Sequence, residues 1–371
     1  PVWISRAELR LLSSALDWEQ DRGKQTLLRT VYTDYRDAYE AAYQRAESVL
    51  DEAEGNEGDD EQATARSLQG RRDQLVAELL ALDERFFDDL SLLAGSEDEE
   101  RIIDAAKRLH ERQRQGEIAQ SMSSGFGEEE AFVDLLAVIL EQPNPAELLR
   151  ALSEPLVTYE QQMNTLYDER NDRSETTRKR WRTVQRINEQ GGGLMTGRMA
   201  ETAMDRWREA RSEVNKTNGR IRTVNRQTLQ QMMDQLSDDA AWELRYGYNR
   251  IAFPEIFEDG SSAEDDFEQV RTLPDLTPGQ RESVNSIALD YRSRYFELSE
   301  QMVELRMAQD LDIQPFQMPE PETIQQFIEL ARLEEKREEV NHRARLRLRL
   351  LLTESQLDRL PDLRRQTTEP V

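Results

Sequence analysis

The stretch LTPGQ, residues 276–280, predicts where a long helix begins, and the related stretch LTESQ, residues 352–356, predicts a second helix start. Thr277 is the expected N-cap, whose hydroxyl accepts a hydrogen bond from the first helical turn. Pro278 then occupies the first helical position, where a missing N–H is tolerated, and Gln280 can reach back to the N–H of the cap. Both stretches therefore indicate capping boxes, which set backbone geometry and carry no catalytic chemistry.

Helical periodicity extends over most of the chain. Apolar residues recur at intervals of three and four, which is the pattern of helices that bury one face. The helices expected from this pattern cover residues 5–50, as one or two helices, and then 63–93, 96–114, 129–141, 146–187, 203–236, 264–273, 278–308 and 323–350. Charged residues make up 33% of the chain and hydrophobic residues 37%, a balance typical of long hydrated helices. The sequence therefore predicts an all-α fold.

One segment has a different pattern. In RARLRLRL, residues 343–350, polar and apolar residues alternate with the period of a strand. The window around it is rich in helix formers, so we expect this segment to be helical.

Three glycines at residues 191–193 separate two long apolar patterns of similar length. Each has roughly 35 residues, and a helix of that length reaches on the order of 50 Å. Two such helices around a glycine turn predict an antiparallel coiled-coil hairpin. A phosphate-binding loop is the alternative, but no strand pattern precedes the glycines and no Lys-Ser or Lys-Thr pair follows them. An exposed aromatic row near Trp181 and Trp207 would make the hairpin a docking arm.

Short matches indicate that the two ends of the chain are copies of one helical unit. Residues 16–20, LDWEQ, repeat the pattern of residues 276–280, with Asp17 as the expected N-cap. Residues 34–39 match residues 290–295 in an Asp-Tyr-Arg triplet followed by a second tyrosine.

A third match joins the helix start expected at Ser96, with Glu99 at the capping-box position, to the start at Thr353. We expect two related multi-helix units that flank the hairpin. The expected division is an N-terminal helical unit, residues 1–125, a hairpin insert with an aromatic anchor, residues 126–262, and a C-terminal helical unit, residues 263–371.

The charge balance and the absence of cysteine exclude several classes of function. The chain has 75 acidic and 49 basic residues and a formal charge of −26, which repels phosphate backbones and anionic lipid headgroups. Nucleic acid is therefore not an expected partner. There is no cysteine, so disulfides and thiolate chemistry are excluded. No apolar run reaches about 18 residues, so no membrane insertion is expected.

No motif in the chain points to catalysis or to a cofactor. The two histidines, His110 and His342, lack the paired spacing of a zinc helix, and surface helix positions are expected for both. The acidic stretch 51–62 does not have the ligand spacing of an EF-hand loop, which favours a solvated connection over a calcium site. We expect no catalytic residues, no cofactor and no metal site.

The two capped stretches resemble the LTxxQ-motif family of exported bacterial helical proteins, the group of the Spy and CpxP periplasmic chaperones. The resemblance covers residues 264–371 and reaches the N-terminal half only through degenerate copies. The residues that carry it are Leu276, Thr277, Gln280, Leu352, Thr353 and Gln356. It implies an all-helical, non-enzymatic periplasmic protein that binds other proteins in envelope stress or assembly. The family members are small and have a basic concave face, so the scaffold transfers to this large acidic chain better than chaperone activity does.

Two functional hypotheses follow. The first is an exported helical module that binds a protein partner through exposed apolar stripes, and the second is a structural subunit of a larger assembly, with the hairpin as its docking arm. An enzyme with a carboxylate or metal site is a third, disfavoured hypothesis. The identity of the partner and the formation of a homo-oligomer stay open. The chain begins at Pro1 without an apolar leader, as a mature exported chain or a trimmed one would.

Overall fold

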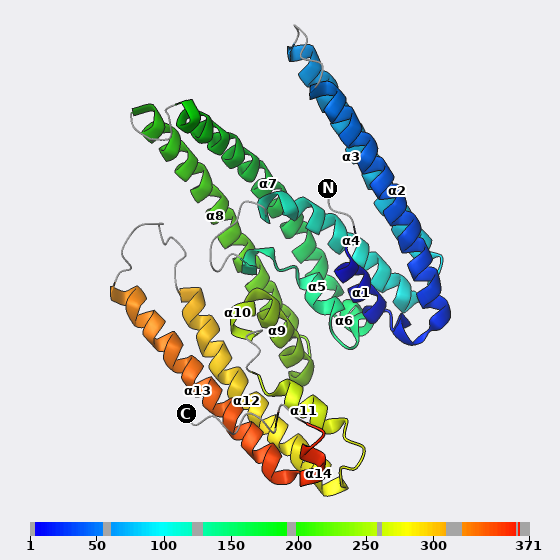
Figure 1. The fold of residues 1–371 in the computed structure, drawn as a ribbon, viewed down its shortest axis with the longest axis vertical. Coiled ribbons are helices and arrows are strands. Elements are labelled where there is room, and N and C mark those ends of the chain that lie inside the picture. Colours follow the sequence, from blue (N-terminus) through cyan, green and yellow to red (C-terminus); the bar gives the residue numbers. More distant parts are fainter. Residues whose placement is uncertain are drawn as a thin grey trace. The chain divides into compact units, whose positions relative to one another are not determined.

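The computed structural model describes residues 4–54, 61–120, 129–190, 198–257, 262–308, 321–360 and 363 (Figure 1). Within these ranges the chain forms α-helices and two short 3-10 helices, and no strand, so the predicted all-α fold is confirmed. Contacts divide the chain into two compact units. Unit 1 comprises residues 1–124 and 131–248, and unit 2 comprises residues 125–130 and 249–371.

Unit 1 is built from two long helical hairpins and several short helices. Its helices are α1 (Arg6–Ala15), η1 (Trp18–Gln20), α2 (Arg22–Glu54), α3 (Glu61–Ser91), α4 (Glu97–Gln120), α5 (Leu135–Leu140), α6 (Pro145–Ala151), α7 (Ser153–Gln190), α8 (Arg198–Met233) and α9 (Asp238–Ala252), whose last residues belong to unit 2. Helices α2 and α3 lie side by side, as do α7 and α8, and α4 packs against α7 and α6 (Figure 1). Helix α5 is apolar at every position and almost fully buried, so it lies at the centre of this packing.

The predicted hairpin corresponds to α7 and α8, which pack along each other. Its glycine turn, residues 191–193, lies outside the described residues. The interior of the hairpin is partly polar, because Ser174, Thr177, Thr217 and Asn218 are buried there. The knobs-into-holes packing of a coiled coil stays a prediction, as does the division of the chain at residues 125 and 262. By its contacts, the hairpin groups with the N-terminal helices in unit 1.

Unit 2 is a smaller helical unit with its own core. Its remaining helices are η2 (Glu129–Phe132), which straddles the division between the units, α10 (Pro254–Phe257), α11 (Glu264–Arg271), α12 (Pro278–Ala308), α13 (Pro321–Leu351) and α14 (Glu354–Leu357). Helices α12 and α13 form a long antiparallel pair, and α11 packs against α12 (Figure 1). Phe267, Val284, Tyr291 and Leu348 are among the side chains that fill the core between them.

The alternating segment 343–350 lies within α13 and is helical, as predicted. Its Ala344 and Leu348 face the core, whereas Leu346 and Leu350 are exposed. A helix can accommodate this alternation because only every third or fourth side chain has to be buried.

The aromatic segment at residues 251–257 packs into the core of unit 2. Phe253, Ile256 and Phe257 are buried, and the rings of Phe257 and Phe296 have centroids 6.4 Å apart. Arg337, itself buried, donates a hydrogen bond to the Ile256 carbonyl oxygen. Core packing is therefore the role of these aromatic residues, as the sequence suggests. Among the described helices, none is both long and apolar enough to span a bilayer.

Candidate functional site

The two LTxxQ stretches form the capping boxes that the sequence predicts. At the start of α14, the Thr353 hydroxyl accepts from the Gln356 N–H at 3.4 Å, and Gln356 Oε1 accepts from the Thr353 N–H at 2.9 Å. At the start of α12, the Thr277 hydroxyl accepts from the Gln280 N–H at 3.2 Å, and Gln280 Oε1 accepts from the Thr277 N–H at 3.0 Å. Each stretch therefore begins a helix by satisfying backbone donors that would otherwise have no partner.

The structure brings the two stretches together, which the sequence did not predict. Gln280 Nε2 donates to Gln356 Oε1 at 3.1 Å and to the Leu351 carbonyl oxygen at 2.9 Å. Gln356 Nε2 donates to the Asp275 carbonyl oxygen at 3.1 Å. We call this arrangement the glutamine clasp, and it fastens the start of α12 to the α13–α14 turn. Leu276 and Leu352 are buried in the core of unit 2 beside it.

A corresponding junction exists in unit 1, but its N-cap is not the predicted one. Asp17 has a left-handed backbone, with φ of 53°, and its side chain makes no capping hydrogen bond. The expectation that Asp17 is an N-cap is therefore wrong. A 3-10 turn follows Asp17, and Asp21 caps α2 one turn later, its Oδ1 accepting from the N–H groups of Gly23 at 2.8 Å and Lys24 at 3.1 Å.

Because Asp21 caps α2, the residues of unit 1 that correspond to the first LTxxQ stretch lie four positions later than predicted. Asp21 and Lys24 now occupy the places of Thr277 and Gln280, at the same offset of 256 residues that relates Tyr35 to Tyr291. Lys24 Nζ lies 2.5 Å from Glu99 Oε1, so an ion pair stands where unit 2 has the glutamine clasp.

Glu99 holds this junction together with several contacts. The Ser96 hydroxyl accepts from the Glu99 N–H at 3.2 Å, which confirms Ser96 as an N-cap. The Glu99 side chain does not return to the Ser96 N–H. Its Oε2 accepts from the Gly95 N–H at 2.6 Å, and its Oε1 accepts from Trp18 Nε1 at 3.0 Å. The start of α4 is thereby tied to the turn before α2.

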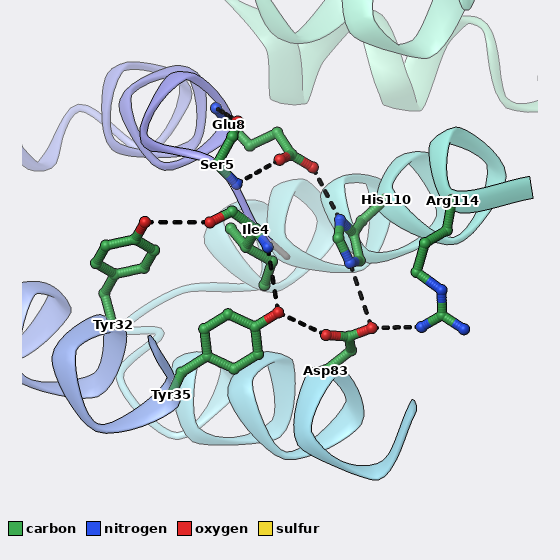
Figure 2. A network of polar contacts seen from close by, with 8 residues as sticks. All are labelled: Ile4, Ser5, Glu8, Tyr32, Tyr35, Asp83, His110 and Arg114. Carbon is green, nitrogen blue, oxygen red and sulfur yellow. Dashed lines mark hydrogen bonds and ion pairs between the residues drawn. The ribbon is translucent and has the colours of Figure 1, made fainter. Parts of the chain in front are cut away.

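A buried tyrosine hydroxyl connects three segments in each unit. In unit 1, the Tyr35 hydroxyl accepts from the Ile4 N–H at 3.1 Å and donates to Asp83 Oδ1 at 2.6 Å (Figure 2). In unit 2, the Tyr291 hydroxyl accepts from the Ala263 N–H at 3.0 Å and donates to Asn341 Oδ1 at 2.9 Å. The same link thus joins the backbone before a short helix to two long helices in both units.

Unit 1 adds a buried ion network around His110, which joins α1, α3 and α4 (Figure 2). His110 Nδ1 lies 2.8 Å from Glu8 Oε1, and Nε2 lies 3.4 Å from Asp83 Oδ2 without hydrogen-bond geometry. Arg114 forms an ion pair with the same Asp83 oxygen. The side chain of His110 is only 2% exposed, so the expectation of a surface position is wrong for His110, whereas His342 is exposed as expected.

The carboxylates keep His110 protonated. Burial of the imidazole lowers its pKa, but the close contact with the negative carboxylates of Asp83 and Glu8 outweighs burial and raises the pKa to about 9. Burial likewise opposes ionisation of Glu8 and Asp83, yet contact with His110 and their other hydrogen bonds lowers the pKa of both carboxyls. The network is therefore ionised near neutral pH, and its charges compensate each other.

This network is better suited to holding helices together than to catalysis. A general acid or base works best when its pKa lies near the working pH, but the pKa of His110 is raised to about 9 and the pKa values of Glu8 and Asp83 are lowered. A pocket of about 290 Å³ lies between α3 and α4 beside the network, with Leu80, Phe87, Lys107 and Arg114 in its lining. In the part of the chain that the structure describes, no group of three or more His, Asp or Glu side chains could hold a metal ion.

Trp181 and Trp207 also meet, although they come from opposite arms of the α7–α8 hairpin. Their ring centroids are 5.0 Å apart, and both side chains are half-buried. The Arg211 guanidinium lies over the Trp207 ring at 5.5 Å from its centroid. The pair therefore packs the two arms against each other, and its role as a partner contact stays a prediction.

Comparison of the chain with protein-family models, curated proteins and solved structures found no match. The function therefore has to follow from the residues and contacts of this chain and from the resemblance carried by its two LTxxQ stretches.

Proposed function

We propose that the chain is a non-enzymatic, exported helical protein that binds other proteins, distantly similar to the LTxxQ periplasmic chaperones. The observation that carries this proposal is the exposure of large apolar side chains in stripes on the long helices. Val76 and Leu80 form such a pair on α3, and Leu346 and Leu350 form one on α13. Single exposed apolar residues are ordinary on protein surfaces, but repeats at helical spacing offer a partner a continuous apolar contact.

Two helix junctions, the glutamine clasp in unit 2 and the Lys24–Glu99 contact in unit 1, support the similarity to an LTxxQ scaffold. The glutamine clasp uses both glutamines of the LTxxQ stretches, which suits a motif whose role is to hold helices at a fixed angle. The two tyrosine links and the two capped junctions further support an internal duplication of the helical unit. A duplicated scaffold would present two long helical pairs to partners.

Suppression of aggregation tests the proposal directly. The light scattering of an unrelated, thermally unfolding protein should fall when the full chain is added at about equimolar concentration, because its apolar stripes cover exposed apolar surface. A variant carrying Val76→Ser, Leu80→Ser, Leu346→Ser and Leu350→Ser should suppress less. If a several-fold excess of the unaltered chain has no effect on scattering, chaperone-like binding is excluded.

The alternative is a structural subunit that uses the α7–α8 hairpin as a docking arm. The partial exposure of Trp181 and Trp207 favours it, because aromatic side chains are common anchors at interfaces. Light scattering coupled to size-exclusion chromatography separates the two functions. A large homo-oligomer that dissociates on Trp181→Ala and Trp207→Ala would favour the structural subunit, and a monomer or dimer would favour the binding module.

A further inference from the structure

The first turns of α13 carry an apolar stripe made by Ile324, Phe327 and Ile328. Their side chains are 48%, 44% and 50% exposed. Their spacing of three and one places them on one face of the helix, within two turns. We call this surface the α13 stripe. It is the largest group of exposed, bulky apolar side chains within two turns of one described helix.

The scaffold shared by the two units does not require apolar residues at these positions. Asn341 of α13 corresponds to Asp83 of α3 through the tyrosine links, at an offset of 258 residues. The fully buried leucines Leu348 and Leu90 have the same offset. At this offset the residues of the α13 stripe correspond to Arg66, Gln69 and Gly70. The three apolar side chains are therefore a feature of α13 that the common fold does not explain.

The surroundings of the α13 stripe are acidic. The start of α13 lies beside the end of α12 in the antiparallel pair (Figure 1). Residues 297–308 and 321–336 together contain seven glutamates and three basic residues. Of the basic residues, Arg306 and Arg332 already form ion pairs with Glu255 and Glu329. A partner that covers the stripe therefore meets a negative field.

We propose that the α13 stripe docks a basic amphipathic helical segment of a partner protein. This inference rests on the proposed function and names the chemistry of its partner. Apolar side chains of the segment would cover Ile324, Phe327 and Ile328, while lysines or arginines would face the surrounding glutamates. A second copy of the chain is the poorer occupant, because its own α13 stripe would bring a second acidic surface into contact.

Two synthetic peptides of about 20 residues test the charge preference. They carry identical leucines at helical spacing, and their remaining positions are lysine-rich in one and glutamate-rich in the other. Fluorescence anisotropy during titration with the full chain should show at least about tenfold tighter binding of the lysine-rich peptide. Equal affinity for the two peptides would overturn the proposal.

Matched variants test the location. Combining Ile324→Ser, Phe327→Ser and Ile328→Ser should weaken binding of the lysine-rich peptide at least about tenfold. The control combines Leu27→Ser, Val157→Ser and Leu289→Ser, which alters exposed apolar residues on other helices, and should change affinity less than about twofold. Circular dichroism checks that both variants stay folded.

The outcomes separate this inference from the general function. The chain with Ile324→Ser, Phe327→Ser and Ile328→Ser is called the α13 variant. If it binds the lysine-rich peptide as tightly as the unaltered chain, the α13 stripe is not the docking site. The general protein-binding function then still stands if the unaltered chain suppresses aggregation. If the unaltered chain neither binds the peptide nor suppresses aggregation, both proposals fail. A molecular mass that rises with concentration and returns to that of a monomer in the α13 variant would identify a second copy as the occupant and overturn the proposal.

Discussion

At the scale of single residues, His110 connects α1 and α3 to α4 in unit 1. Its imidazolium lies between Glu8 and Asp83, and removal of the positive charge would leave the partly buried Glu8 carboxylate and the buried Asp83 carboxylate with less compensation. An uncompensated buried charge is among the most costly features of a folded protein.

We predict that His110→Gln lowers the free energy of unfolding by about 3 kcal/mol, because the glutamine amide can donate hydrogen bonds but carries no positive charge. Chemical denaturation followed by circular dichroism measures the change. The control is His342→Gln, which alters an exposed histidine on α13 and should change stability by less than about 0.5 kcal/mol. Equal effects of the two substitutions would contradict the role assigned to the His110 network.

The pH dependence of stability follows from the same contacts. The pKa of His110 is raised in the folded chain from its ordinary value of 6.5 to about 9. The folded state therefore binds this proton more tightly than the unfolded state. The stabilisation that comes from protonated His110 is fully present below about pH 6.5 and is lost as the pH rises through about 9. The free energy of unfolding should thus decline over this interval in the unaltered chain, and the decline should be smaller in His110→Gln.

An NMR titration of the imidazole measures the pKa directly. A midpoint near the ordinary value, or identical pH profiles for the two proteins, would contradict the prediction.

Glu8 and Asp83 make stability depend on pH in the acidic range, because the pKa of each is lowered in the folded chain. Their contribution is present above the ordinary carboxyl range and is lost as the pH falls through the lowered values.

At the scale of helices, the junctions at the ends of the long pairs determine how the elements meet. Each capping box is a local device, but the glutamine clasp joins two of them across the fold. Unit 1 makes the corresponding connection with Lys24 and Glu99. The two units therefore have different side-chain chemistry at the same place in the arrangement of helices.

We predict that Gln280→Ala and Gln356→Ala each lower the free energy of unfolding by about 1–2 kcal/mol, since each leaves the N–H of the capping threonine without its acceptor and one backbone carbonyl without its donor. Their combined effect should be non-additive by about 0.5–1 kcal/mol, because the two side chains contact each other. A double-mutant cycle from denaturation curves measures this coupling. Gln301→Ala, at an exposed position of α12, is the control, and strictly additive effects of the clasp substitutions would contradict the interpretation.

At the scale of the whole molecule, two units with separate cores should lose stability separately. The tyrosine links allow the same substitution to be made in each. We predict that Tyr291→Phe weakens unit 2 by about 1–2 kcal/mol, because the Ala263 N–H and the Asn341 side chain lose their common partner. Tyr35→Phe should weaken unit 1 for the same reason.

Hydrogen exchange measured by mass spectrometry locates the effect of each substitution. Tyr291→Phe should speed exchange in α11, α12 and α13 and leave α1 to α4 unchanged, and Tyr35→Phe should do the reverse. Tyr43→Phe alters an exposed tyrosine and should change neither unit. Loss of protection throughout the chain after either substitution would show that the two units unfold as one.

The sequence by itself determined that the chain is all-α and where several of its helices begin. Thr277, Thr353 and Ser96 all cap helices as predicted, because a cap depends on hydrogen bonds to residues at most three positions away. Asp17 was the exception, since local sequence could not distinguish a helix start from a 3-10 turn that delays it by four residues. The pattern also identified the tyrosines Tyr35 and Tyr291 as matching positions.

Only the tertiary structure decided which of these features meet. The contact between Gln280 and Gln356, the burial of His110 and the pairing of Trp181 with Trp207 all join residues that are distant in the chain. Such contacts depend on how the apolar faces of several helices pack together, and periodicity within one helix does not specify its neighbours. A histidine in a charge-rich helix is therefore read from sequence as a surface residue, whereas packing of α1, α3 and α4 makes it the centre of a buried ion network.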